Sequence, residues 1–360
     1  MRMPAILAAG LATLALPAVS DEVETAQLEI VAEFDTGPGN VTVTPEGRII
    51  VSMHQFYAPE VRVYEVGPEG ARAPFPTPDW AGPLGEDGIG FSSVLGLRAS
   101  VEGVVWMLDN GLADGVPARL VGWDTRADTL VDTIEIPASA SVEGSFHNDL
   151  ALDAERPLAY IADLAGALVV VDLETGAARR VLDGHASTAA DDVDMVVHGR
   201  RLTAPDGTPH RVAVNPITIS ADNAWVYYGA MHGLTVWRVP TAALADADLG
   251  ADALAARVER YGAKPPSDGI TVDDAGHVYI TDTGGNAVGV TAPDGSYRPL
   301  VVDPRLEWPD GMSAAPDGWI YVTVNRLNDV AFLNGGETLE PIGPYVLARF
   351  RPLAPVTPGR

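Results

Sequence analysis

Asparagine and aspartate residues stand just before short apolar stretches at five places along the chain. These leader residues are Asn40, Asn148 with Asp149, Asn215, Asp268 and Asp310. Carboxylate and amide oxygens together suit a hard divalent cation such as Ca²⁺ or Mg²⁺. A bound cation would offset the repulsion between the carboxylates, polarise a carbonyl group and lower the pKa of a bound water. At strand starts the same residue types often bond only backbone amides, which is the structural alternative.

Each leader belongs to a longer pattern that is clearest between Ser267 and Thr283. Ile270 and Val272 alternate with polar residues, a turn rich in Asp and Gly follows, and a second alternating stretch completes a β-hairpin. Related patterns begin near the leaders and near Leu95, at spacings between 42 and 66 residues. Six such units predict an all-β, six-bladed β-propeller, because one blade cannot cover its own apolar faces.

Two other all-β architectures fit the repeat less well. A β-sandwich would not repeat its leader six times, and the repeat of a parallel β-helix would be far shorter. In a propeller the leaders of the innermost strands converge on one end of the central channel. We therefore expect the polar leaders to form one ring.

The first twenty residues predict a signal peptide. Arg2 is followed by an apolar run from Ala5 to Val19, which is too short to span a membrane, and cleavage is expected after Ser20. Residues 21–360 would then form a single propeller domain in the periplasm or outside the cell. The sequence has no cysteine, which excludes disulfides and thiolate nucleophiles.

The charge balance of the chain is strongly acidic. Forty-nine Asp and Glu residues against 23 Lys and Arg residues give a formal net charge of −26, which disfavours nucleic acid and anionic membranes as partners. The sequence contains neither a Gly-rich phosphate loop nor a Gly-x-Ser-x-Gly motif. A monomer that binds a small molecule is the expectation.

Segments outside the repeat also carry predictions. Leu244, Leu249, Leu254 and Val258 have helical spacing, which predicts a short helical insertion between blades four and five. The strand-like segments Gln27–Phe34 and Tyr345–Phe350 should pair in one blade and close the ring.

Residues beside the leaders could shape a pocket over the ring. His147 directly precedes Asn148, so we expect it at the channel mouth. Phe146 and Tyr228 could line an apolar pocket there. Packing between blades is the alternative role for each aromatic residue.

The chain resembles the major royal jelly protein and Yellow family. The resemblance rests on Ala159–Asp163, on Ser267-Asp268-Gly269, and on the segment from Leu306–Asp310 to Asn325-Arg326-Leu327. It implies a six-bladed propeller, usually secreted, whose pocket at one channel end binds small ligands in some members. Asn40, His147, Phe146, Tyr228 and Asp310 are the residues that we assign to such a pocket.

A looser resemblance links the chain to the senescence marker protein and gluconolactonase family, whose propellers depend on a divalent metal. By position, this resemblance implies Asn148, Asn215 and Asp268 as the metal ligands, with Asp268 or Asp149 taking a proton during hydrolysis of a lactone. The acidic first-blade ligand of that family is replaced here by Gly39-Asn40. Small-molecule binding and metal-dependent hydrolysis thus remain alternatives, and a protein-interaction propeller is a third.

Overall fold

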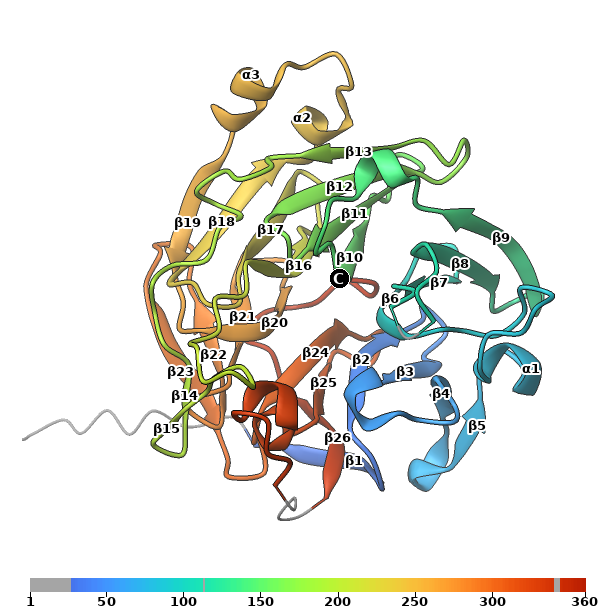
Figure 1. Cartoon of the computed structure of the whole chain (residues 1–360), viewed down its shortest axis with the longest axis horizontal. Coiled ribbons are helices and arrows are strands. Elements are labelled where there is room, and N and C mark those ends of the chain that lie inside the picture. The colour runs from blue at the N-terminus through green and yellow to red at the C-terminus, as the bar shows by residue number, and fades with distance from the viewer. Residues whose placement is uncertain (1–26, 113, 340–343) are drawn as a thin grey trace, which may run out of the picture.

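Six four-stranded antiparallel sheets surround a central channel in the residues that the computed structural model describes (Figure 1). The described residues are 27–112, 114–339 and 344–360. The predicted six-bladed β-propeller is therefore confirmed. The predicted signal peptide, residues 1–20, lies outside the described residues.

Each of the first three blades runs from an inner strand beside the channel to an outer strand at the rim. Blade one comprises β2 (Pro38–Val43), β3 (Ile49–Met53), β4 (Val63–Val66) and β5 (Arg72–Pro74). Blade two comprises β6 (Val94–Ala99), β7 (Val104–Asp109), β8 (Arg119–Asp124) and β9 (Thr129–Glu135). Blade three comprises β10 (His147–Leu152), β11 (Leu158–Asp163), β12 (Ala167–Asp172) and β13 (Ala178–Val181).

Blades four to six repeat this arrangement, and the last one combines both ends of the chain. Blade four comprises β16 (Val214–Ile219), β17 (Trp225–Ala230), β18 (Thr235–Pro240) and β19 (Glu259–Ala263). Blade five comprises β20 (Ser267–Val272), β21 (Val278–Asp282), β22 (Ala287–Thr291) and β23 (Tyr297–Val302). Blade six comprises β24 (Pro309–Ala314), β25 (Ile320–Val324), β26 (Tyr345–Phe350) and β1 (Glu29–Phe34).

The two chain ends close the ring by strand pairing. β1 runs antiparallel to β26, with Phe34 opposite Tyr345 and Glu29 opposite Arg349. The predicted pairing of the terminal strands is confirmed. Beyond β26 the chain crosses the underside of blade five, where the backbone N–H of Asp274 donates to the carbonyl of Pro355. It ends on the channel axis, as the C marker shows (Figure 1).

The core lies between neighbouring blades. Alternate side chains of each strand face the next blade, so the buried apolar residues form clusters at the blade interfaces. One of these clusters joins blades three and four and includes Tyr160, Leu168, Ile217, Val226 and Tyr228. Such packing fixes the inner strands relative to one another, which positions the leaders.

A bulge at the start of every inner strand turns the leaders toward the channel. In all six blades the register between the inner strand and its neighbour shifts at this point, for example between Val214 and Ile217 and between Ser267 and Ile270. A β-bulge inserts an extra residue and re-aims the side chain at that position. The repeated polar leader is therefore the sequence signature of a repeated bulge.

Insertions between strands cover parts of the rim and of one channel end. The predicted helical insertion is present as α2 (Thr241–Ala245) and α3 (Ala251–Ala255). It lies within blade four, between β18 and β19, and not between blades four and five as predicted, because the outer strand of blade four follows the helices. A further helix, α1 (Pro78–Ala81), precedes blade two. Among the described residues no helix is both long and apolar enough to cross a membrane.

Two segments from distant parts of the chain form a cap on the leader end of the channel. One contains the hairpin of β14 (Val196–Val197) and β15 (Arg200–Arg201), and the other contains the 3-10 turns η4 (Leu327–Asp329) and η5 (Ala331–Leu333). They share one apolar cluster, to which Met195, Val197, Leu202, Met231, Trp308, Leu327, Val330 and Leu333 belong. The other 3-10 turns are η1 (Gln55–Tyr57), η2 (Pro68–Gly70) and η3 (Ala138–Ala140).

Candidate functional site

Three of the leaders form a hydrogen-bonded row at one end of the channel. Nδ2 of Asn148 donates to Oδ1 of Asn215 at 2.7 Å, and Nδ2 of Asn215 donates to Oδ1 of Asp268 at 3.0 Å. The indole N–H of Trp308 donates to Oδ2 of Asp268 at 2.7 Å. Both oxygens of Asp268 therefore accept from neutral donors, which fix the orientation of the carboxylate.

The neighbouring leader, Asp310, is held in a similar way. Nδ2 of Asn325, at the end of β25, donates to Oδ2 of Asp310 at 2.6 Å. The glycine after each of these two aspartates allows the inner strands to approach closely. A Cβ atom on Gly269 would lie 1.9 Å from the carbonyl oxygen of Asp310, and one on Gly311 would lie 2.1 Å from Oδ1 of Asn40.

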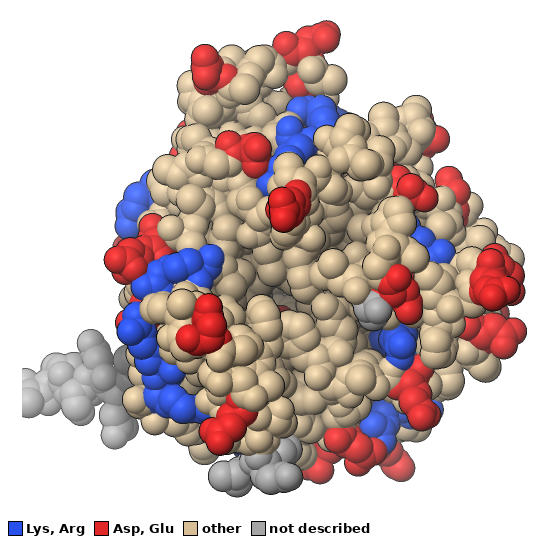
Figure 2. Space-filling view, viewed as in Figure 1, with Lys and Arg blue, Asp and Glu red and all other residues tan. Residues whose placement is uncertain are grey.

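The row forms part of the wall of a pocket of about 430 Å³. Its polar lining comes from Asn148, Asn215, Asp268 and Asp310, together with His54, Gln55 and Arg211. Its apolar lining consists of Phe56, Leu95, Leu112, Phe146, Leu164, Val212, Met231, Leu327, Phe332 and Leu333. The leader of blade two is Leu95, so the ring of leaders is apolar at this one position and polar at the others. A hollow opens at the centre of this face, and the charged side chains lie mostly toward its edge (Figure 2).

Burial makes the two pocket carboxyls weaker acids than ordinary aspartates. It raises the pKa of Asp268 to about 6, against the hydrogen bonds from Trp308 and Asn215 and with an added contribution from the charge of Asp149. Burial also raises the pKa of Asp310 well above its ordinary value, and the charges of Asp268 and Asp149 add to the rise. The two carboxyls therefore oppose each other's ionisation, and a cation between them would relieve this repulsion.

A buried lysine lies close to Asp268. Nζ of Lys264 donates to Oγ of Ser267 at 2.9 Å and to the carbonyl of Pro265 at 3.1 Å. Burial lowers the pKa of Lys264 to about 7, although the charges of Asp191, Asp268 and Asp282 oppose this. The lysine is therefore only partly charged at neutral pH, so it cannot fully balance the carboxylates.

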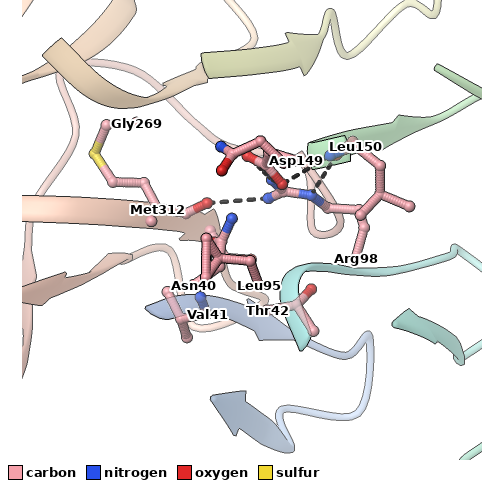
Figure 3. Close-up of polar contacts among 12 residues, drawn as sticks. Asn40, Val41, Thr42, Leu95, Arg98, Asp149, Leu150, Gly269 and Met312 are labelled. Carbon is pink, nitrogen blue, oxygen red and sulfur yellow. Dashed lines mark hydrogen bonds and ion pairs between the residues drawn. The ribbon is translucent and has the colours of Figure 1, made fainter. Parts of the chain in front are cut away.

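Deeper in the channel, the buried carboxylate is paired with an arginine. Arg98 of β6 crosses the axis, where it donates to the carbonyl of Met312 at 3.0 Å and to the carbonyl of Leu150 at 3.3 Å (Figure 3). Its guanidinium lies 3.4 Å from Oδ2 of Asp149, and both side chains are buried. Burial raises the pKa of Asp149 even though the charge of Arg98 lowers it.

The structure brings only some of the predicted site residues to the pocket. Asn148, Asn215, Asp268, Asp310 and Phe146 line it. Asn40 and Asp149 lie outside the lining. Oδ1 of Asn40 accepts from the backbone N–H of Val41, and Asp149 faces Arg98.

His147 and Tyr228 do not reach the pocket, contrary to the sequence-based expectation. The bulge after His147 leaves the imidazole buried with Nε2 3.1 Å from Oγ of Ser141, and burial lowers the pKa of His147. Tyr228 lies on the second strand of its blade, which does not border the channel. Its ring is fully buried between blades three and four, and its hydroxyl lies 2.8 Å from Oγ of Ser187.

The predicted metal ligands fit a cation poorly. The side-chain oxygens of Asn215 and Asp268 already accept hydrogen bonds from Asn148, Asn215 and Trp308. Asn40 supplies a neutral side chain already bonded to the backbone. Within residues 27–112, 114–339 and 344–360, no three His, Cys, Asp or Glu residues are grouped so that they could hold a metal. Of the three predicted ligands only Asp268 has a carboxylate, and the neighbouring carboxyl of Asp310 already accepts a hydrogen bond from Asn325.

Several residues of the channel end were not predicted. Arg98 could have been suspected, because it is a charged residue inside the apolar inner strand Val94–Ala99. Trp308 lies in a segment that carries the family resemblance, but neither Trp308 nor Lys264 was assigned to the site, since the contacts that bring them to Asp268 come from the tertiary fold. Leu112 and Phe332 lie in loops whose path the repeat does not specify.

The sequence of residues 92–334 matches the model of the major royal jelly protein family. The chain belongs to the major royal jelly protein family. The match extends from blade two to the cap, so it includes the whole row from Asn148 to Asp310. No curated protein matches the chain significantly.

Solved structures that resemble this royal jelly family propeller share its fold at low sequence identity. A gluconolactonase of Xanthomonas campestris superposes with a TM-score of 0.56 at 12% identity, covering 94% of this chain and 93% of that chain. A virginiamycin B lyase from Staphylococcus aureus gives a TM-score of 0.52 at 13% identity, covering 91% and 99%. A calcium-binding regucalcin from Agrobacterium tumefaciens gives 0.50 at 16% identity, covering 93% and 98%.

Proposed function

We propose that this royal jelly family propeller binds a small apolar molecule that carries a protonated amine, in the pocket at the leader end of its channel. The observation that carries the proposal is the placement of two buried carboxyls, Asp268 and Asp310, in the lining of an otherwise mostly apolar pocket. A cation bound between them would offset both their burial and their mutual repulsion.

The walls of the pocket indicate what the rest of the ligand is like. Phe56 and Phe332 stand at the mouth with their ring centroids 5.2 Å apart, and Phe146 lies on the lining. Flat apolar groups pack well against such rings, and a volume near 430 Å³ suits a single compact molecule. An alkylamine that carries an aromatic ring therefore matches both parts of the site. We also propose that the protein acts outside the cytoplasm, after removal of residues 1–20.

Calorimetric titration with three matched compounds tests the proposal. Phenethylamine, phenethyl alcohol and phenylacetate share an aromatic ring and differ in charge. The amine should bind most tightly and the carboxylate least tightly. Equal affinity for the amine and the alcohol would contradict recognition by charge, and no binding of any of the three would contradict the proposed ligand class.

A pair of charge-matched variants locates the binding. Asp268→Asn should weaken amine binding about tenfold or more, because it removes a charge-assisted contact. Asp294→Asn removes one negative charge from an exposed turn and should leave amine binding unchanged. Equal losses in the two variants would indicate a general field effect of the acidic surface and would argue against the pocket.

Metal-dependent hydrolysis is the second candidate. Its support is the fold shared with a gluconolactonase and with a calcium-binding regucalcin, together with the ring positions of Asn148, Asn215 and Asp268. The hydrogen bonds within the row speak against it. Titration of the metal-stripped protein with Ca²⁺ decides between the two: tight binding that Asp268→Asn abolishes would favour hydrolysis, and no heat of binding would favour the amine site.

A further inference from the structure

Blade one contributes two polar side chains to the pocket that have no part in binding an amine. His54 and Gln55 follow β3, and the backbone N–H of His54 donates to the carbonyl of Gly37 at 2.9 Å. This bond ties the turn to the residue just before the inner strand β2. His54 is only 3% exposed, and both side chains belong to the pocket lining. Their hydrogen-bonding polarity therefore bears on what else the pocket can bind.

A backbone contact decides which imidazole nitrogen of His54 carries the proton. His54 is the N-cap of η1, and its Nδ1 accepts from the backbone N–H of Phe56 at 3.2 Å. Burial lowers the pKa of His54 to about 3, so the ring is neutral at ordinary pH. A neutral imidazole whose Nδ1 accepts must carry its proton on Nε2. Among the described residues this Nε2–H has no nitrogen or oxygen acceptor, so His54 offers the pocket one neutral donor.

A second series of contacts sets the orientation of the Gln55 amide. The backbone N–H of Leu112 donates to Oδ1 of Asn110 at 3.2 Å, which identifies the other amide atom of Asn110 as its nitrogen. That nitrogen donates to Oε1 of Gln55 at 2.9 Å. Because a donor holds the oxygen of Gln55, its Nε2 hydrogens are the part of the side chain left for another partner. In the part of the chain that the structure describes, they have no acceptor.

The lining therefore contains two groups of opposite polarity. Blades five and six supply the carboxyls of Asp268 and Asp310, whereas blade one supplies the neutral donors of His54 and Gln55. An ammonium group has no acceptor, so it cannot bond to these donors. A carbonyl oxygen has two lone pairs and can accept from both. A buried donor without a partner is costly, so a ligand that brings such an acceptor gains affinity.

We propose that His54 and Gln55 form a second subsite of the pocket, in which their two neutral donors bind a carbonyl oxygen of the ligand. The ligand is then an alkylamine whose aromatic part carries a carbonyl group. The pairing of this carbonyl with an amine rests on the proposed function, whereas the binding of a carbonyl by the two donors does not.

Two amines of similar shape test the subsite. 4-Acetylphenethylamine and 4-isopropylphenethylamine differ mainly in that the first has a carbonyl oxygen where the second has a methyl group. Calorimetric titration should show that the acetyl compound binds about tenfold more tightly, because only its oxygen can accept from the two donors. Equal affinities for the two amines would overturn the proposal.

A variant of one donor locates the effect. Gln55→Met keeps the length of the side chain and removes the amide. The preference for the acetyl compound should fall at least threefold, while the affinity for the isopropyl compound stays within about twofold of the parent. The second value shows whether the pocket is intact. Gln27→Met makes the same substitution at an exposed residue outside the lining and should leave the preference unchanged. A parental preference in Gln55→Met would contradict the role of Gln55.

NMR of the parent protein tests the donors without any variant and without an amine. The proton of the His54 ring should be found on Nε2. Acetophenone should move the resonances of this N–H and of the Gln55 amide downfield, and isopropylbenzene should not. A proton on Nδ1, or the same response to both compounds, would overturn the proposal.

The two sets of measurements separate this subsite from the proposed function. If acetophenone moves the donor resonances but no amine binds, the proposed amine site fails while the carbonyl subsite stands. If phenethylamine binds through Asp268 but the acetyl and isopropyl compounds bind equally, the carbonyl subsite fails while the proposed function stands.

Discussion

The leader end and the middle of the channel treat buried carboxyls in opposite ways. Asp149 faces the guanidinium of Arg98 in a space that side chains fill. Asp268 and Asp310 receive only neutral hydrogen bonds, and they border a cavity of about 430 Å³. All three carboxyls are buried, so the difference lies in direct contact with a cation: Arg98 contacts Asp149, whereas Lys264 bonds Ser267 and acts on Asp268 only through its charge. A buried acid in contact with its own guanidinium maintains the fold, whereas the two acids with only neutral hydrogen bonds are the ones that we propose for ligand binding.

The largest effect should follow from removing the internal cation. Arg98→Met should lower the free energy of unfolding by about 3–5 kcal/mol, because it leaves Asp149 buried without its partner and removes the hydrogen bonds to the carbonyls of Leu150 and Met312. Urea denaturation measures the loss. Arg126→Met, which breaks the exposed pair with Glu46, should cost less than about 1 kcal/mol. Similar losses of unfolding free energy for the two variants would show that the buried pair of Arg98 and Asp149 contributes no more to stability than an exposed ion pair.

The pH dependence of stability should separate the pocket from the rest of the channel. Asp268 has a pKa of about 6 in the folded protein and an ordinary value of 3.8, so the folded state binds its proton more tightly than the unfolded state. This group therefore favours folding at low pH and loses that contribution as the pH rises from about 4 to 6.

The size of this change follows from the pKa difference. It amounts to about 3 kcal/mol over that window. Between about pH 4 and pH 6, the free energy of unfolding of the parent should fall by this amount relative to that of Asp268→Asn. Urea denaturation at each pH would measure it. The comparison with the variant is needed because carboxyls with lowered pKa, such as Asp153, change stability in the opposite direction. A constant difference between parent and variant across the window would show that Asp268 is an ordinary acid.

The smallest effect should come from the neutral part of the pocket. Phe332 is about half exposed and touches Phe56 across the mouth. Phe332→Leu should weaken phenethylamine binding about threefold, because it removes one aromatic contact worth roughly 0.5–1 kcal/mol. It should leave the unfolding free energy within about 0.5 kcal/mol of the parent. A loss as large as that of Asp268→Asn would mean that the walls, and not the charges, dominate recognition.

The sequence predicted the fold because the repeat is local. One hairpin contains the whole pattern: the leader, the alternating Ile270 and Val272, and the turn of Asp and Gly that follows them. Copying this hairpin six times leaves radial closure as the consistent architecture. The same locality predicted that Asn148, Asn215, Asp268 and Asp310 would share one channel end, since each stands at its own inner-strand bulge.

The rest of the site depends on contacts that no local pattern encodes. Trp308 reaches Asp268 across 40 positions of sequence, and Arg98 reaches Met312 across 214. His147 shows the limit even within one strand. It is adjacent to Asn148, but the bulge turns one side chain into the channel and the other into the core.

The terminal segments make the completion of this fold a late event. Glu29 of β1 and Arg349 of β26 lie 320 positions apart and hydrogen-bond to each other, so blade six lacks an outer strand until both are present. Contacts of such separation are slow to form. Most of the chain must be synthesised before these two strands can pair. Until then blades one to five form an open array whose unpaired strand edges can associate with other chains. The final ten residues then bring Arg360 to the carbonyl of Leu152 at the base of the channel. The ring can therefore close only after β26 has been synthesised, 320 positions beyond its partner strand β1.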